Sequence, residues 1–481
     1  MLWLALHFPD LALQVFPQPP DAEPFAVCSV GSRPEVLAAT PAARQLGITP
    51  GMGVAAAGAL APGLVVQPRS ARLEAAALDG IATWALQFTP EVSPAPPDAV
   101  LLEIGGCLRL FGGLEPLLAR VREGLAEMGL DAVPAVAITA AGAHFLARAG
   151  LAIEALDRDA LARHLGALSL ACLDYPAKAL DALAAMGVRT LGDCLRLPRD
   201  GLARRFGPGL PDALDRAFGR QPDPRPRFAL PERFAARLEW AAPVFEVEAL
   251  LFAVKRLLAQ LCGWLAARNA GVRRLTLSLS HEKLAPTRVD LALATPQRAA
   301  PHLLALLRER LERVSLVSGV VGLELAAAET AQIVPMNFSL FGDSSRLRED
   351  CLNLVERLQA RLGPEAVSGL ALYPEHRPEL AWQEVVAGKV AAGTATPGAA
   401  LPLRPAWLLD RPRPLPGSGE LPWLDGPVSL LAGPERIESG WWDEAPVRRD
   451  YYLAQAASGA RLWVYRELVD PGRWFLHGLF A

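Results

Sequence analysis

The region 231–335 contains the pattern that most restricts the fold. A strand-like segment near 235–241 precedes a long helical segment at 246–269. Two segments of alternating polar and apolar residues follow, RRLTLSLSHE and TRVDLALATP, and then a helical pattern at 297–313 and a strand at 319–327. Alternation with a period of two indicates a half-buried strand. The resulting order βαββαβ is the signature of a small split-βαβ sandwich.

The regions before this sandwich have a different character. Residues 1–154 alternate short apolar runs with helical patterns, which indicates an α/β region. Residues 155–230 are helical and punctuated by Gly and Pro, and LAAMGVRTLGDCLRLPRDGLARRFGPGL repeats a helix, Gly turn, helix theme. We therefore predict a multidomain α+β fold. The strands expected before residue 155 are 2–6, 25–30, 36–39, 99–104, 107–111 and 134–139, and the helices are 69–87 and 114–129.

The last third of the chain divides into three regions. Residues 336–382 read as a loop and an amphipathic helix at 344–362. Residues 383–426 are rich in Pro, Gly and Ala and read as a linker. Residues 427–481 are rich in aromatic side chains and predict a small β ribbon. The apolar face expected on the helix consists of Leu347, Cys351, Leu354, Val355, Leu358 and Leu362.

Length and composition set limits on location and chemistry. The chain of 481 residues is longer than one ordinary core organises. Its formal net charge is −3, so nucleic-acid binding would require local basic patches. The six Cys form no C-x-x-C pair, which argues against a structural zinc site and fits a reducing cytoplasm. We expect no signal peptide and no membrane span, since the first apolar run is short.

Three stretches, in this order, resemble the Y-family translesion DNA polymerases. TPAARQLGITPGM (40–52) is similar to the fingers motif, LLEIGGCLRLFGG (101–113) to the central palm hairpin, and the stretch from GVRTLGDCLRLP to RRFG (187–207) to the thumb's helix-hairpin-helix. The resemblance implies a polymerase-like right hand. Its parts would be palm and fingers (1–154), a helical thumb (155–230) and the βαββαβ little finger (231–335).

The same resemblance raises the question of metal binding. Two-metal phosphoryl transfer needs carboxylates that hold both ions. The positions that carry them in the family match His7, Pro9, Gly105 and Gly106 here. Proline and glycine offer no side-chain ligand, and His is a poor ligand for Mg²⁺. The resemblance therefore implies a protein that is not an enzyme and binds no metal or cofactor, with Gly105 and Gly106 on a hairpin facing the end of the first strand.

The alternative is that the protein retains a weak catalytic activity. Asp10 and Glu103 are displaced carboxylates that would hold an ion in a low-activity DNA nucleotidyltransferase. Arg44 matches the family's triphosphate-contacting Arg and is expected to be a vestige of nucleotide binding. Pro41 stands where the family has a stacking aromatic residue. This replacement would weaken nucleotide binding.

Segments in the last third resemble one branch of the family, the catalytically inactive ImuB-type proteins. The segments are EHRPELAW (375–382), GPERIESGWWDE (433–444) and RRDYYLAQAASGARLWVYRE (448–467). The resemblance implies a scaffold of the bacterial mutasome in the SOS response to DNA damage. Its implied partners are DNA, the sliding clamp, an error-prone C-family DNA polymerase and a RecA-like accessory protein. It would work in the cytoplasm, at the nucleoid.

The segment MNFSLFGD (336–343) places apolar side chains where a loop should be polar. It is similar to a sliding-clamp peptide, in which an amide bonds at the rim and a Leu-Phe pair fills an apolar pocket. The residues expected to bind the clamp are Asn337, Phe338, Ser339, Leu340 and Phe341. The alternative is that these residues fold back as a local staple.

Two groups of residues are candidates for DNA contact. The thumb turn would present backbone N–H groups to a phosphate, with a plain helical hairpin as the alternative. The little finger carries 13 Lys and Arg against 10 Asp and Glu, a net charge of +3. Its contacts would be independent of sequence and sensitive to salt, although an ordinary solvated face is as good a reading for any single residue. The candidates are Gly187, Val188 and Arg189 in the thumb and Arg273, Arg274, Lys283 and Arg288 in the little finger.

The tail contains more aromatic residues than a small ribbon is expected to hide completely, although most of them are expected to form its core. Exposed aromatic side chains are typical interaction hot spots, so a subset would dock a protein partner, and stacking on single-stranded DNA is the alternative. The histidines at 144, 281, 302 and 376 show no ligand spacing and are expected to be structural. The residues expected to bind the partner are Trp441, Trp442, Tyr451, Tyr452 and Trp463.

Overall fold

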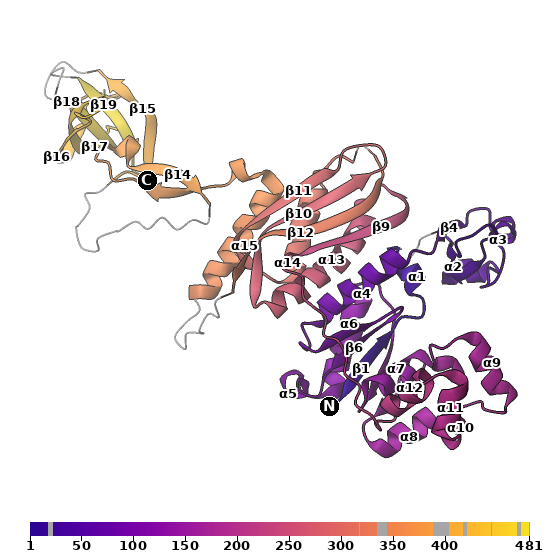
Figure 1. Cartoon of the computed structure of the whole chain (residues 1–481). Helices are drawn as coiled ribbons and strands as arrows, with labels where there is room; N and C mark the ends of the chain where they lie inside the picture. Colours follow the sequence, from indigo (N-terminus) through magenta and orange to yellow (C-terminus); the bar gives the residue numbers. More distant parts are fainter. Residues whose placement is uncertain are drawn as a thin grey trace. The chain divides into compact units, whose positions relative to one another are not determined.

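The computed structural model divides the chain into two compact units, Met1–Arg346 and Leu347–Ala481 (Figure 1). The predicted multidomain α+β class is confirmed. We keep the names palm, fingers, thumb and little finger for the regions of the first unit. The structure describes residues 1–17, 23–316, 318–333, 344–387, 404–416, 421–443, 445–468 and 473–480.

The palm is built on a sheet of five strands in the order β5-β6-β1-β7-β8. The first strand lies at its centre and pairs antiparallel with β6 and with β7. Leu4, Ala5 and Leu6 are fully buried because helices cover both faces. The strands are β1 (Trp3–His7), β5 (Val92–Ala95), β6 (Ala99–Glu103), β7 (Val133–Ala137) and β8 (Glu154–Ala155).

The two faces of the sheet belong to separate hydrophobic clusters. Leu4 and Leu6 pack with residues of α4 and α6, whereas Ala5 packs with residues of α7 and the thumb. This division follows from the two-residue period of a strand. The helices are α1 (Leu11–Gln14), α4 (Ala71–Ala85), α5 (Leu108–Phe111), α6 (Leu114–Glu127) and α7 (Ala140–Arg148) (Figure 1).

The fingers and thumb are small additions to this palm. The fingers have a three-stranded sheet in the order β3-β2-β4 and two short helices. The thumb is helical, as expected. The fingers elements are β2 (Phe25–Cys28), β3 (Val36–Ala39), α2 (Pro41–Gln45), α3 (Val54–Leu60) and β4 (Val65–Pro68). The thumb helices are α8 (Arg158–Gly166), the 3-10 turn η1 (Leu170–Cys172), α9 (Ala177–Ala185), α10 (Leu191–Arg196), α11 (Arg199–Phe206) and α12 (Gly209–Ala217).

The little finger has the predicted βαββαβ order. Its sheet runs β11-β10-β12-β9, so each crossover helix joins two parallel strands that have an antiparallel strand between them. Among the described residues, α13 is the one helix long and apolar enough to cross a membrane, but two thirds of its apolar window is buried, as in a core helix. The elements are β9 (Ala235–Val244), α13 (Val247–Ala267), β10 (Ala270–His281), β11 (Thr287–Gln297), α14 (Ala300–Leu311) and β12 (Val320–Gln332).

The second unit begins with a helix and ends in a five-stranded antiparallel sheet of order β15-β19-β18-β17-β16. Its first strand falls inside the range predicted as a linker, so the sheet starts earlier than expected. The elements are α15 (Ser344–Leu362), η2 (Pro364–Ala366), β13 (Ser368–Leu372), η3 (Pro378–Leu380), β14 (Trp382–Val386), β15 (Trp407–Leu415), β16 (Ser429–Ser439), β17 (Val447–Gln455), β18 (Arg461–Glu467) and β19 (Trp474–Leu479).

The face of α15 that the sequence predicts to be buried is largely exposed. Leu354 and Leu362 are each more than half exposed, and Cys351 is exposed as well. Glu356 and Ala360, on another side of the helix, are buried instead. The apolar periodicity therefore identified the helix correctly but not the side that packs.

Candidate functional site

The end of β1 is where the family resemblance places a metal site. His7 is the last residue of the strand and pairs with Ala99 at the start of β6. The turn that joins β5 to β6 therefore lies beside it, and the Phe8 N–H donates to the Asp98 carbonyl at 2.8 Å. The His7 Nε2 atom lies 3.5 Å from Asp98 Oδ2. The structure thus brings together an imidazole and a carboxylate that the sequence reasoning did not connect.

This contact is electrostatically favourable for the carboxylate. Burial would raise the pKa of Asp98, but its hydrogen bond to His7 and the nearby charges of His7 and Arg148 outweigh burial and lower this pKa. Burial and the charge of Arg148 lower the pKa of His144 to about 4. His7 Nδ1, Asp98 Oδ1 and His144 Nε2 are buried atoms without a hydrogen-bond partner in the part of the chain that the structure describes.

The expected position of Gly105 and Gly106 is wrong. Because β1 and β6 are antiparallel, His7 pairs with Ala99 and Trp3 pairs with Glu103. Residues after Glu103 therefore lie at the opposite end of β1, four residue steps or about 14 Å from His7. The two glycines follow this far end of the strand and do not face the imidazole.

Glu103 has a structural role at that far end. Its Oε1 atom accepts hydrogen bonds from the backbone N–H groups of Leu2 at 3.0 Å and Gly105 at 3.2 Å. Asp10 lies beyond the other end of β1, so the two displaced carboxylates do not meet. Within the described residues, there is no group of three or more His, Cys, Asp or Glu side chains that could hold a metal ion.

Arg44 does reach the turn after β1. Its Nη2 atom lies 3.3 Å from Asp10 Oδ2, and both side chains are about half exposed. With Pro41 and Gln14 they line a cavity of about 260 Å³, and the buried Arg256 of α13 also borders it. Arg256 donates from Nη1 to the Gln14 carbonyl at 2.6 Å, which ties the little finger helix to α1.

The thumb turn does not present free N–H groups. The N–H of Gly187 donates to the Ala184 carbonyl and that of Val188 to the Leu183 carbonyl. The Arg189 N–H donates to Asp193 Oδ2 at 3.1 Å, in the capping box of α10. The predicted phosphate contact through these three N–H groups is therefore wrong, and the exposed Arg189 side chain is what remains for DNA.

The little finger cations are distributed over the sheet and its loop. Leu275, Leu277 and Leu279 of β10 are buried under the helices, so Arg274 lies on the open face. Arg288 shares that face because it pairs with Ser278. Acidic residues share it too: Arg274 lies 3.9 Å from Glu329, and Thr276 donates to Asp290. Arg273 sits at a bulge and donates to the Ala294 carbonyl, and Lys283 lies in the exposed loop after β10.

The clamp motif, Asn337 to Phe341, lies outside the described residues. Its prediction rests on the sequence alone.

The tail separates its aromatic residues into a core and an exposed pair. Tyr451 and Trp463 are buried and stack with ring centroids 4.2 Å apart, so their assignment to partner docking is wrong. Tyr452 is half-buried beside Trp474. Trp441 is 80% exposed and Trp442 is 57% exposed. The sheet could hide more aromatic side chains than expected because it has apolar clusters on both faces.

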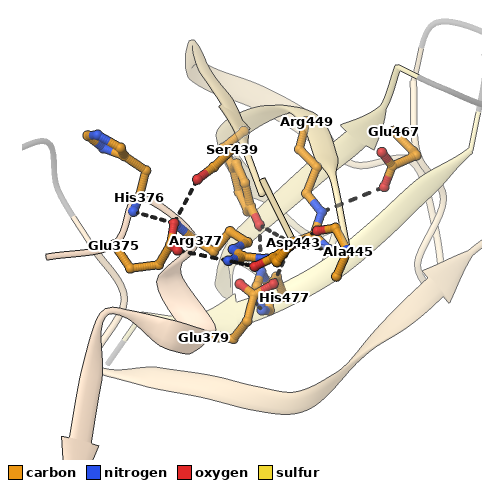
Figure 2. A network of polar contacts seen from close by, with 11 residues as sticks. Glu375, His376, Arg377, Glu379, Ser439, Asp443, Ala445, Arg449, Glu467 and His477 are labelled. Carbon is orange, nitrogen blue, oxygen red and sulfur yellow. Dashed lines mark hydrogen bonds and ion pairs between the residues drawn. The ribbon is translucent and has the colours of Figure 1, made fainter. Parts of the chain in front are cut away.

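A polar cluster joins the three segments that carry the ImuB-type resemblance (Figure 2). Arg377 is buried and donates to Glu375 at 2.8 Å and to Asp443 at 2.5 Å. Glu379 accepts from Arg449 of β17 at 2.8 Å. The sequence reasoning missed this cluster, although an Arg between two Glu residues in EHRPELAW was a visible signal.

One family model and several solved structures are similar to parts of this chain. Residues 18–148 match the model of the IMS family, described as impB/mucB/samB. Among solved structures, DinB from Sulfolobus solfataricus is 19% identical, with coverage of 68% of this chain and 98% of that one and a TM-score of 0.38. An insertion ternary complex of Dbh DNA polymerase is 18% identical, covers 70% of this chain and 100% of that one, and gives a TM-score of 0.39. The similarity to the IMS family model lies within the palm and fingers region.

The similarity to one branch extends over nearly the whole chain. Protein ImuB of Caulobacter vibrioides, in two strains, is 28% identical over 474 residues. The match covers 91% of this chain and all of each relative. The predicted resemblance to ImuB-type proteins is confirmed.

Proposed function

We propose that this protein is a non-catalytic, polymerase-like scaffold in damage-induced translesion DNA synthesis and mutagenesis. The observation that carries the proposal is the contact of His7 with Asp98 at the end of β1. Two-metal phosphoryl transfer needs several carboxylates around both ions. Here the carboxylate beside the end of β1, that of Asp98, contacts the His7 imidazole. Pro9 offers no side-chain ligand for a metal ion.

The competing function is a low-activity DNA nucleotidyltransferase. Its two displaced carboxylates, Asp10 and Glu103, lie beyond opposite ends of β1, and Asp10 is paired with Arg44. The carboxylates left to support it are Asp98 and Asp10. Primer extension by the purified full chain with Mg²⁺ or Mn²⁺ tests it. We expect no extension; extension that is lost on Asp98→Ala would overturn the scaffold proposal.

The partners of the scaffold would be DNA, the sliding clamp, an error-prone C-family DNA polymerase and a RecA-like accessory protein. The similarity to ImuB proteins over 91% of the chain supports this set. The clamp would bind the segment 336–343, and the protein partners would bind the tail. Such a scaffold would work in the cytoplasm, at the nucleoid, as part of the SOS response.

A pull-down with the proteins encoded by the same genome tests these partners one at a time. The full chain would carry the tag, and the clamp, the C-family polymerase and the RecA-like protein would be added as purified proteins. We expect each to be retained at physiological salt. Retention of none of the three would contradict the scaffold proposal.

A further inference from the structure

The exposed Trp441 and Trp442 lie in the loop between β16 and β17. Their rings are 5.2 Å apart in an edge-to-face arrangement with an interplanar angle of 82°. Large exposed indoles are enriched among the residues that dominate protein interfaces. A loop that holds two of them in one conformation avoids the entropy cost of ordering them on binding.

Arg377 is the group that fixes this loop, although it lies more than 60 residues earlier in the chain. Its Nη1 atom donates to Asp443 Oδ1 and to the Ala445 carbonyl, each at 3.1 Å, and its Nη2 atom donates to Asp443 Oδ2 at 2.5 Å (Figure 2). The same Asp443 Oδ1 atom accepts from the Ala445 N–H at 3.1 Å. One guanidinium therefore bonds both the carboxylate that follows the two indoles and the backbone two residues later.

The loop is also shaped to receive that guanidinium. Gly440 has a φ of +79°, and a Cβ atom there would lie 2.5 Å from the Ala445 carbonyl oxygen and 2.7 Å from Arg377 Nη1. Only glycine permits both this backbone conformation and the close approach of the arginine. Gly440, which immediately precedes Trp441, therefore packs directly against the Arg377 guanidinium.

Arg377 is also held by a second carboxylate, that of Glu375. Glu375 Oε2 accepts from its Nη2 atom, and Glu375 Oε1 accepts from the Ser439 hydroxyl at 2.7 Å. Ser439 is the buried last residue of β16, directly before the loop. The side chains of Arg377 and Glu375 are only 5% and 6% exposed. The cluster is therefore an interior support for an exposed loop.

We infer that Arg377 is a positioning residue, which fixes Trp441 and Trp442 as a rigid two-indole knob for a protein partner. The inference rests on the proposed docking of a partner to the tail, and it adds the segment 375–380 to the docking site. The two carboxylates around Arg377 leave the support with a net charge of −1, which repels a nucleic-acid backbone. The complementary partner surface is an apolar pocket with a cationic rim.

The positioning role is tested without any partner. The full chain is labelled with fluorinated tryptophan, and the 19F signals of Trp441 and Trp442 are assigned by single Trp→Phe substitutions. We expect both signals to lie away from the position of a freely solvated indole and to move to it in Arg377→Met. The signals of the core residues Trp463 and Trp474 should stay in place. Arg436→Met is the matched control, because Arg436 bonds Asp450 on the same sheet but not the loop.

A second variant covers the case in which Arg377→Met unfolds the tail. Asp443→Ala removes both Arg377–Asp443 bonds, while Arg377 keeps its bonds to Glu375 and to the Ala445 carbonyl. The Asp443 side chain is 41% exposed, so the fold should tolerate this change. Unmoved Trp441 and Trp442 signals in a folded Asp443→Ala protein would overturn the positioning role.

The docking role is tested with the C-family polymerase proposed as a partner. We expect a loss of at least tenfold in affinity for Trp441→Ala/Trp442→Ala and for Asp443→Ala, and less than twofold for Arg436→Met and for Trp423→Ala, which removes another half-exposed indole. If the polymerase does not bind even the unaltered chain, the proposed partner is wrong, while the 19F experiment still decides the role of Arg377. Movement of the two signals on adding oligothymidine would overturn the assignment to a protein partner.

Discussion

At the scale of residues, the site at the end of β1 is organised by contacts among its own side chains. Asp98 meets His7, and Asp10 meets Arg44. A carboxylate that is already bonded to a cation or an imidazole offers less negative charge to a metal ion. The contact between Asp98 and His7 therefore stabilises the turn between β5 and β6. Both contacts occupy carboxylates that a metal site would need to be unpaired.

Replacing Asp98 by Asn should destabilise the fold at neutral pH. The pKa of Asp98 in the folded protein lies below the value in an unfolded chain, about 3.9. The ionised carboxylate therefore stabilises the fold above that pH, and this contribution is lost as the pH falls through the folded-state pKa. We expect a loss of about 1 kcal/mol at pH 7, measured by thermal unfolding of the full chain, and a loss that shrinks as the pH approaches 3.

Asp10→Asn is the matched control for this substitution. It breaks an ion pair whose two side chains are about half exposed, and such pairs contribute about 0 to 1 kcal/mol. Equal stability of the Asp98→Asn variant and the unaltered protein at pH 7 would show that the contact with His7 does not hold the turn.

At the scale of elements, the open face of the little finger sheet is the part most suited to a DNA backbone. Arg274 and Arg288 lie on it, together with neighbouring carboxylates. Contacts of this kind release counterions, so their number is measured by the salt dependence of binding rather than by affinity at one salt concentration.

The double variant Arg274→Ala/Arg288→Ala should bind duplex DNA more weakly at every sequence. If each side chain contacts one phosphate, the slope of log K against log salt should fall by about 2. Fluorescence anisotropy between low and moderate salt measures it. Arg122→Ala, which removes an exposed palm arginine paired at 3.8 Å with Glu115, should leave the slope unchanged. An unchanged slope in the double variant would remove this face from the DNA-binding surface.

The palm hairpin shows why some elements could not be predicted from the sequence. The run LLEIGGCLRLF reads as two strands around a Gly turn, yet the second half forms the short helix α5. The true hairpin joins β5 to β6, and β5 contains Pro94. Proline removes a ladder donor and argues against a strand, but β5 is at the edge of the sheet, where proline is tolerated. The role of Asp98 was missed because β5 was not predicted, and Asp98 lies in the turn that joins β5 to β6.

The little finger, in contrast, could be predicted from the sequence. Its strands alternate polar and apolar residues because one face of the sheet is covered by helices and the other is open. The tail could be predicted only in part. Its strands were visible in the sequence, but composition does not show that side chains are buried on both faces of its sheet. A contact such as that between Arg377 and Asp443 joins distant segments and leaves no local periodicity to detect.

At the scale of the whole molecule, the segment 336–343 lies between the little finger and the helix α15 in the chain. If it is a clamp ligand, Leu340→Ala/Phe341→Ala removes two anchors. Each is typically worth about 2 kcal/mol at an interface, or about thirtyfold in affinity, which should abolish clamp binding. Thermal unfolding should barely change, because exposed residues contribute little to stability.

The staple alternative makes the reverse prediction for the same variant. It expects a clear drop in melting temperature and little specific effect on the clamp. Surface plasmon resonance with immobilised clamp measures the affinity, and Ser339→Ala serves as a mild control within the motif. Unchanged clamp binding by a well-folded double variant would end the assignment of these residues to the clamp.

The division into two units predicts where the chain tolerates truncation. A chain of residues 1–346 keeps every strand and helix of the first unit and should fold with the thermal stability of that unit in the full protein. A chain of residues 1–425 keeps β15 without β19, which is its partner in the described sheet, and Arg377 without Asp443. A buried arginine that loses one of its two carboxylates and a strand that loses its paired neighbour should leave residues 347–425 unfolded. Limited proteolysis should therefore trim the 1–425 chain back towards residue 346 and spare the full chain, and resistance of residues 375–415 to the protease would show that this segment folds without the rest of the sheet.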